Sequence, residues 1–563
     1  MHWFKSFLAS VGGVLLITQA AVAAEFISFS IIGKDFTLSI DTLETYLAAN
    51  QLGDQESAVL DGLLLDSLSN QEQIREVLQS RYQLDPLAVE GLFQSSMVEE
   101  FLYQIGEAIR SEDKQNGAIA IQAALKQAAG QEEGFTLLDI LRQFPGEKIQ
   151  IDPVETLEIL VEVGQLIQQT DAMLESLEKL AAVEAAQTPR INWNQALDLR
   201  QSGTFRTQRQ ELTIANDRRG GELKADLYLP TPLNRAATAT ATGTVPVIVI
   251  SHGLASGRRG FEPLARHLAS YGFVVAVPQH PGSDRGRLEA LLKGETAEFF
   301  DLQEFIDRPL DVSDVLDHLE ELNTSQFNQA LNLETVGMFG HSFGGYTALS
   351  LAGARIDFAQ LETDCQPNQA PTNPSLFLQC QALQLSDTSD TSDTLDNSLN
   401  TLRDERVQAV AVLNPVNRSL FGQAGLSQIK IPVMMIGSSK DLLAPLVTEQ
   451  IRTFTWLTTR RRYLVVKEND HHFYESQEMN QSVLPNIGGL VESPTEVTRG
   501  YVNALGTAFF KTFVAEEPDY ERYLGADYGQ WVSESPLNLF VVQSLSEAEV
   551  SQVLDRIERR WRN

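Results

Sequence analysis

The chain has 563 residues, of which 43% are hydrophobic and 21% are charged, so it has the composition of an ordinary globular protein. It is too long for one hydrophobic core, and two or three domains are expected. The formal net charge of −32 excludes the basic surface that nucleic-acid binding requires and disfavours attraction to anionic membranes.

The first residues have the pattern of a signal peptide. Lys5 is followed by the apolar residues 7–17, and Ala21-Val22-Ala23 is a small-residue cleavage site. A signal peptide over residues 1–24 predicts a secreted or periplasmic protein. The apolar stretch is shorter than the roughly 20 residues of a spanning helix, so we expect no stable membrane insertion after cleavage. An uncleaved anchor is the alternative.

Residues 25–190 are expected to form a mainly helical accessory domain. Its start, residues 26–39, alternates apolar and polar side chains around Gly33-Lys34-Asp35 and predicts a short hairpin. Helical spacing of apolar residues follows over residues 41–186. This zone contains no His and no Cys, so it has few side chains that could take part in catalysis.

Residues 200–515 are expected to form a catalytic domain of the α/β class. Apolar strands separated by helices predict a mostly parallel sheet with helices on both faces. A hairpin with its turn at residues 217–221 opens the domain. Strands are expected at residues 204–215, 222–229, 245–250, 273–277, 335–339, 407–413, 432–436 and 463–466, and helices at residues 260–270, 311–322 and 345–354.

Two insertions and one extension complete the predicted organisation. Residues 283–306 could cap the site. Residues 364–400, rich in Ser, Thr, Asp and Asn, are expected to form a surface loop, and residues 516–563 a helical extension. The two cysteines, Cys365 and Cys380, lie in the polar insertion, where an oxidising compartment would join them as a disulfide. Two unrelated buried thiols are the alternative.

No cofactor or metal is expected. Two cysteines are too few for a structural zinc site, and the sequence has no His-x-x-x-His motif or carboxylate cluster. It also has no Gly-x-Gly-x-x-Gly loop after a strand.

The run Gly340-His341-Ser342-Phe343-Gly344 predicts a nucleophilic serine. It lies between an apolar strand and a helix that begins near Gly345. A turn this tight strains the backbone of Ser342, and Gly340 and Gly344 are needed where no side chain fits. The helix N-terminus and the Phe343 N–H then face a developing oxyanion. The alternative is a glycine-rich junction with an incidental serine.

A serine nucleophile needs a base and an orienting acid, which follow it in the order acid, then histidine in such folds. Asp441 comes shortly after the strand at residues 432–436, where parallel sheets assemble their sites. A helix N-cap is its alternative role. His472 follows the strand at residues 463–466 and is preferred as the base over its neighbour His471.

The loop after the first long parallel strand, residues 251–257, is expected to supply the second oxyanion donor through the N–H of Leu254. His252 lies upstream of the serine. We therefore interpret it as a hydrogen-bonded loop residue and not as the base.

Three segments resemble the platelet-activating-factor acetylhydrolase group of α/β hydrolases, which is similar to dienelactone hydrolases and bacterial polyester hydrolases. They are residues 252–254, residues 269–276 and residues 340–345, and the stretch 308–312, Arg-Pro-Leu-Asp-Val, adds to them. The resemblance covers about residues 205–473. The N-terminal zone looks like an accessory domain of unknown function found ahead of such hydrolases in bacteria.

The resemblance implies metal-free hydrolysis of short acyl esters through an acyl-enzyme. It implies a triad of Ser342, Asp441 and His472, with oxyanion donors from Leu254 and Phe343. One departure concerns the acid, which some members carry one strand earlier. Here that position is Asn414, which cannot act as a carboxylate, and this favours Asp441 and weakens the transfer of acetyl-phospholipid specificity.

The predicted function is therefore a carboxylic ester hydrolase with a small-molecule or lipid ester as its substrate. A polyester or dienelactone-type esterase is the alternative within enzymes, and a peptidase uses the same triad. A binding protein with a vestigial site is the alternative from another class. The sequence determines neither the acyl-chain length nor the oligomeric state.

Overall fold

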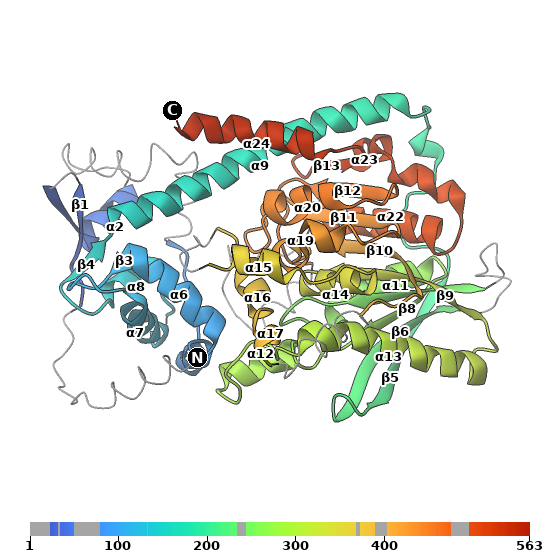
Figure 1. Cartoon of the computed structure of the whole chain (residues 1–563), viewed down its shortest axis with the longest axis horizontal. Helices are drawn as coiled ribbons and strands as arrows, with labels where there is room; N and C mark the ends of the chain where they lie inside the picture. The colour runs from blue at the N-terminus through green and yellow to red at the C-terminus, as the bar shows by residue number, and fades with distance from the viewer. Residues whose placement is uncertain are drawn as a thin grey trace.

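A computed structural model describes residues 23–31, 34–49, 79–131, 133–233, 244–366, 372–388, 402–474 and 495–562. Figure 1 shows a smaller N-terminal part in blue and cyan beside a larger sheet-centred domain in green to red. The predicted signal peptide falls almost entirely outside the described residues. None of the helices in the described ranges is long and apolar enough to cross a membrane.

The larger domain is built on a nine-stranded sheet in the order β13-β12-β11-β10-β9-β7-β8-β6-β5. The strands from β8 to β12 are parallel, whereas β5, β6 and β13 join antiparallel at the two edges. The predicted α/β fold with a mostly parallel sheet is confirmed. The strands are β5 (Arg206–Asn216), β6 (Gly221–Thr231), β7 (Val245–Ser251), β8 (Val274–Pro278), β9 (Leu331–His341), β10 (Val407–Leu413), β11 (Val433–Ser438), β12 (Arg462–Lys467) and β13 (Leu539–Val542).

Both faces of this sheet are buried, which explains why its central strands are continuous apolar runs. In β7, Val247 and Val249 pack into one core and Ile248 and Ile250 into the other, because side chains alternate along a strand. Helices on the first face include α13 (Glu304–Ser325) and α14 (Phe343–Leu351), and on the second α11 (Glu262–Ser270) and α22 (Glu496–Phe513). The remaining elements of the domain are η3 (Arg258–Phe261), α12 (Arg285–Leu292), α15 (Phe358–Asp364), α16 (Ser375–Gln381), α17 (Gln384–Thr388), α19 (Arg418–Leu426), η4 (Leu446–Ile451), α20 (Arg452–Trp456), η5 (Pro518–Leu524), α23 (Ala526–Val532) and α24 (Glu547–Arg562).

The N-terminal part combines helices with a small sheet in the order β2-β1-β4-β3. The predicted hairpin forms, with Phe26 opposite Ser39 and Ile31 opposite Lys34. Two short strands also lie inside the zone of helical pattern, where the sequence predicted none. They were missed because a strand of four residues or fewer is too short to show an alternation of apolar and polar side chains. The elements are β1 (Phe26–Ile31), β2 (Lys34–Ser39), α2 (Ile40–Ala49), α5 (Pro86–Leu92), α6 (Ser96–Ala108), β3 (Ile109–Arg110), α7 (Ala118–Ala129), α8 (Leu137–Arg142) and β4 (Lys148–Ile151).

A 35-residue helix, α9 (Pro153–Gln187), connects the two parts. Asp152 caps it by accepting hydrogen bonds from the N–H groups of Val154 and Glu155, with Pro153 at the first helical position. The helix extends over the larger domain and lies beside α24 (Figure 1). The short η2 (Trp193–Gln195) follows it before β5 begins.

The N-terminal part also contacts the two predicted insertions. The N–H of Ser96 donates to Glu298 of the cap insertion over 3.2 Å, and the Ser95 hydroxyl donates to the same carboxylate over 3.1 Å. The ring of Phe101 in α6 packs edge-on against that of Phe377 in α16, with 5.8 Å between centroids. Both insertions are therefore in contact with the N-terminal part.

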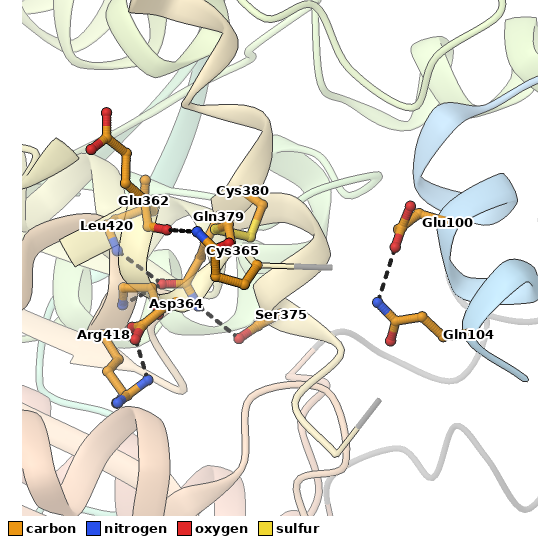
Figure 2. Close-up of a disulfide and its surroundings, with 12 residues drawn as sticks. Glu100, Gln104, Glu362, Asp364, Cys365, Ser375, Gln379, Cys380, Arg418 and Leu420 are labelled. Carbon is orange, nitrogen blue, oxygen red and sulfur yellow. Dashed lines mark hydrogen bonds and ion pairs between the residues drawn. A yellow bond between two sulfur atoms is a disulfide. The ribbon is translucent and has the colours of Figure 1, made fainter. Parts of the chain in front are cut away.

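The polar insertion is not the surface loop that its composition predicts, because its described residues include α16 and α17. Leu378 and Leu385 of these helices are buried in the main core. The predicted disulfide between Cys365 and Cys380 is confirmed, with the Cα atoms 5.7 Å apart (Figure 2). These helices were not predicted because the segment is mostly polar, and its composition does not reveal the few apolar residues that are buried.

Figure 2 also shows how the disulfide segment is held against α19. Arg418 pairs with Asp364 over 3.0 Å, and the Gln379 side chain accepts from the N–H groups of Ser419 and Leu420. These bonds cap the start of α19 with side chains of the insertion.

The C-terminal region is also not entirely helical as expected. Leu539–Val542 forms β13, which pairs antiparallel with β12 and closes that edge of the sheet. Its four apolar residues match either a buried helical turn or a short strand, so tertiary pairing decides the structure.

Candidate active site

Ser342 lies at a sharp turn between β9 and α14. Its backbone angles are φ 53° and ψ −117°, a region that non-glycine residues rarely occupy and one that signals stored strain at functional sites. A Cβ on Gly340 would lie 2.0 Å from the carbonyl oxygen of Gly344, and a Cβ on Gly344 would lie 2.1 Å from that of Ser251. The strand, the turn and the helix therefore approach one another too closely for side chains at these two positions.

Asp441 and His472 form a hydrogen-bonded pair. Nδ1 of His472 donates to Oδ2 of Asp441 over 2.7 Å, and both side chains are buried. The other oxygen of Asp441 accepts from the N–H groups of Leu443 and Ala444 at 2.9 and 2.8 Å. Asp441 thus caps a turn and orients a histidine at once, so the two roles considered for it are compatible.

The backbone of His472 is tied to the neighbours of Ser342. Nε2 of His341 donates to the His472 carbonyl over 2.8 Å, and the two imidazole rings lie 5.0 Å apart. The side-chain amide of Asn414 donates to the same carbonyl over 3.0 Å. Asn414 itself has a φ of 45° at the end of β10, next to Leu413, whose carbonyl accepts from the N–H of Ser342. Asn414 therefore anchors the histidine loop.

A second carboxylate on the histidine loop, Asp470, is engaged elsewhere. It forms a buried ion pair with Lys467 and lies 3.4 Å from the hydroxyl of Ser438. His471, the alternative base, has a backbone carbonyl that accepts from Asn414 over 3.3 Å. Asp441, and not Asp470, is therefore the carboxylate that pairs with the ring of His472.

The loop before Leu254 lies directly beside Ser342. A Cβ on Gly253 would lie 3.3 Å from Cβ of Ser342 and 3.0 Å from Nδ1 of His341. Leu254 packs its side chain against the main core. On the other side, Phe343 is the first residue of α14, whose initial N–H groups have no partner within the helix. Both predicted oxyanion donors therefore belong to segments that border the serine.

His252 is fully buried and fully hydrogen-bonded through its ring. Nδ1 donates to the Gly253 carbonyl over 2.8 Å, and Nε2 accepts from the backbone N–H of His280 over 3.1 Å. Burial, and then the electrostatic influence of His280 and Arg308, lower the pKa of His252 well below its usual range. The ring is therefore neutral and holds the loop, as expected of a structural histidine.

A second Ser-His-Asp network lies behind this loop, and sequence reasoning did not identify it. The Ser251 hydroxyl donates to Nε2 of His280 over 2.9 Å, and Nδ1 of His280 donates to Asp311 over 2.8 Å. Its composition and connectivity are those of a catalytic triad. The sequence did contain an indication of it, because His280 lies two residues after the end of β8 and Asp311 lies in the stretch 308–312 of the family resemblance.

The surroundings of this second network are charged and closed. Ser251, His280 and Asp311 each have 0% of their surface exposed, whereas Ser342 has 8%. Asp311 is paired with Arg218 over 2.8 Å and with Arg219. Burial, and then the nearby arginines, lower the pKa of His280 well below its usual range. Among the described residues, no group of three or more His, Cys, Asp or Glu is arranged to hold a metal ion.

Comparisons with known proteins agree with this architecture. Residues 246–406 match the family model described as alpha/beta hydrolase fold, a range that includes Ser342 and the second network. The larger domain has an α/β hydrolase fold. Residues 23–152 match a second model, described as an alpha/beta hydrolase of unknown function (DUF1400), and this range covers the N-terminal part. No curated protein matches the chain.

Proposed function

We propose that this protein is a serine hydrolase that cleaves carboxylic esters, with Ser342 as its nucleophile. The observation that carries the proposal is the strained backbone of Ser342 between β9 and α14, beside the loop that holds the Asp441–His472 pair. Strain of this kind persists only where the surrounding structure over-determines it, as it does at the turn that carries the Ser342 hydroxyl.

The proposed reaction uses two half-reactions. His472 accepts the proton of Ser342 as Oγ attacks the acyl carbon, and Asp441 stabilises the imidazolium that forms. The N–H groups of Leu254 and Phe343 bind the oxyanion, and the alcohol leaves with the proton from His472. Water then attacks the acyl-enzyme, returns a proton through His472, and releases the acid.

Ser342 is favoured over Ser251 as the nucleophile for two physical reasons. Ser251 is wholly enclosed, and its partners are bound by arginines that the reaction would have to displace. His280 is also held neutral by burial, so it would become an imidazolium only at a large cost. Ser342, in contrast, keeps 8% of its surface exposed.

Short-acyl or lipid-like esters are the proposed substrates. The resemblance to the platelet-activating-factor acetylhydrolase group supports this class. Leu442 and Leu443, directly after Asp441, have 65% and 40% of their surface exposed and offer apolar contact near the site. Export to an oxidising compartment is part of the proposal, and the disulfide supports it.

The test is a panel of p-nitrophenyl esters of increasing acyl length, combined with a fluorophosphonate probe and mass mapping of the labelled peptide. We expect turnover to be greatest from acetate to butyrate and the label on Ser342. Ser342→Ala should abolish both signals, whereas Ser251→Ala should retain them. No turnover and no labelling of the wild type would overturn the proposal, and label on Ser251 would reassign the nucleophile.

A further inference from the structure

Arg308 is the only arginine among the described residues whose whole side chain is buried at 0% exposure. It lies in the second turn of α13, directly before Pro309. Nη2 donates to the backbone carbonyl of His252, and the guanidinium lies 4.5 Å from the centre of the Phe343 ring. One side chain therefore contacts both segments that border Ser342, the Leu254 loop and the start of α14.

The position of Arg308 is itself fixed by α13. Pro309 has no N–H, so the helix cannot satisfy the carbonyl of Phe305, four residues earlier. The hydroxyl of Tyr346 in α14 donates to that carbonyl over 2.7 Å. The ring of Phe305 packs against that of Phe343 at 5.2 Å. The carbonyl that Pro309 leaves without a helical partner thus accepts the hydrogen bond that joins α13 to α14, the helix that carries Phe343.

The guanidinium remains a cation where it lies. Burial lowers the pKa of Arg308 to about 10, which still leaves it protonated at neutral pH. Within the described chain, Nε and Nη1 have no hydrogen-bond partner. The carboxylates of Glu304 and Asp311 act on it at longer range, while both pair directly with Arg219. Its charge is thus available to the segments around Ser342.

We propose that Arg308 is a positioning residue that joins the two halves of the oxyanion hole, holding the His252–Leu254 loop and the Phe343 turn at a fixed separation. This inference rests on the proposed function of Ser342. A cation behind the site adds a field that favours the negative transition state over the neutral ester.

The main experiment replaces Arg308 by Met, which has a similar length and no charge, and counts active sites by prolonged fluorophosphonate titration. We expect kcat per titrated site on p-nitrophenyl acetate to fall about 100-fold, with KM changed less than about three-fold. A butylboronic acid, which forms an anionic tetrahedral adduct with the serine, should bind weaker by a similar factor. Arg308→Lys should restore part of kcat, because the ammonium still donates to the carbonyl of His252.

Arg219→Met is the matched control. Arg219 has only 9% of its side chain exposed, but its guanidinium pairs with carboxylates of α13 and not with either of the segments that border Ser342. It should lose stability and keep its kcat per titrated site. If Arg308 had only a structural role, Arg308→Met would likewise lose stability and keep its kcat per titrated site.

Phe343→Leu keeps the backbone N–H and removes the ring face on which Arg308 rests. It serves if Arg308→Met does not fold, and it should also lower kcat per titrated site. An unchanged kcat per titrated site in folded Arg308→Met, or in Phe343→Leu, would overturn the inference. An inactive, unlabelled wild type would instead overturn the proposed function, so the two failures are distinguishable.

Discussion

Two sets of Ser, His and Asp lie near the loop of residues 252–254. Both contain a histidine whose Nδ1 donates to a carboxylate, but they differ in burial, charge and backbone strain. The Ser251–His280–Asp311 network is closed, and its acid is neutralised by arginines. The Asp441–His472 pair is linked through His341 to the segment of Ser342, whose backbone is strained and which keeps 8% of its surface exposed. Residue type and hydrogen bonding alone therefore do not identify a nucleophile. Under the proposed function, the strained backbone and the 8% exposure of Ser342 distinguish it from Ser251, which is fully buried.

The largest predicted effect concerns the two acids. Asp441→Asn can keep its bonds to the turn, but its amide donates toward His472 and favours the wrong tautomer. We expect kcat on p-nitrophenyl butyrate to fall about 10⁴-fold with little loss of stability. Asp311→Asn is the matched variant and should retain activity per folded molecule within about ten-fold. Equal losses for the two variants would remove the distinction between the networks.

The second prediction concerns stability, for which we expect Asp311 to be important although its replacement has little effect on activity. Asp311→Ala removes the only carboxylate that pairs with His280 among the described residues, and one of the three that pair with Arg219. The free energy of unfolding, measured by urea titration, should fall by about 3–5 kcal/mol. Asp314→Ala removes a more exposed partner of Arg218 and should cost less than about 1 kcal/mol. A small effect of Asp311→Ala would contradict the view that this network is structural.

The third prediction uses acid pH. The pKa of His280 is below its unfolded value in the folded state, so the unfolded chain binds more protons as the pH falls through the ordinary histidine range. Its stabilisation is present above that range and is lost below it. The wild type should therefore lose more stability than His280→Gln between about pH 7 and about pH 5.5.

His267 calibrates this measurement, because burial lowers its pKa to about 4 and it belongs to neither network. His267→Gln should remove about 1 kcal/mol of the pH-dependent change over the same range. If His280→Gln leaves the slope of the unfolding free energy against pH unchanged, His280 is not held neutral by the fold.

The last prediction concerns Ser251→Ala, whose effect is smaller than that of Asp311→Ala. The change leaves Nε2 of His280 as a buried acceptor without its donor. We expect a loss of about 1–2 kcal/mol in thermal or urea unfolding. A gain in stability, or a loss of fluorophosphonate labelling at Ser342, would show that Ser251 does something other than satisfy His280.

The order of strands and helices, the strand–turn–helix at Ser342 and the cysteine pair could all be predicted, because each depends on residues close together in the chain. Val245–Ser251 is recognisable as a buried strand from its own apolar run, and Cys365 and Cys380 are the only two cysteines. The helices of the polar insertion and the strand Leu539–Val542 were missed. Composition averages over a long segment, and a four-residue strand takes its conformation from its partner β12.

By itself, the sequence determined the fold class and selected Ser342, Asp441 and His472 as candidates from their positions after strands. Only the tertiary structure revealed the Ser251–His280–Asp311 network and the place of Arg308. These contacts join residues from β7, β8, α13 and the turn before β6, which are up to about ninety positions apart in the chain. Burial decides what each group can do, because a carboxylate surrounded by arginines is a structural anchor and one facing a histidine beside a strained serine can orient a base.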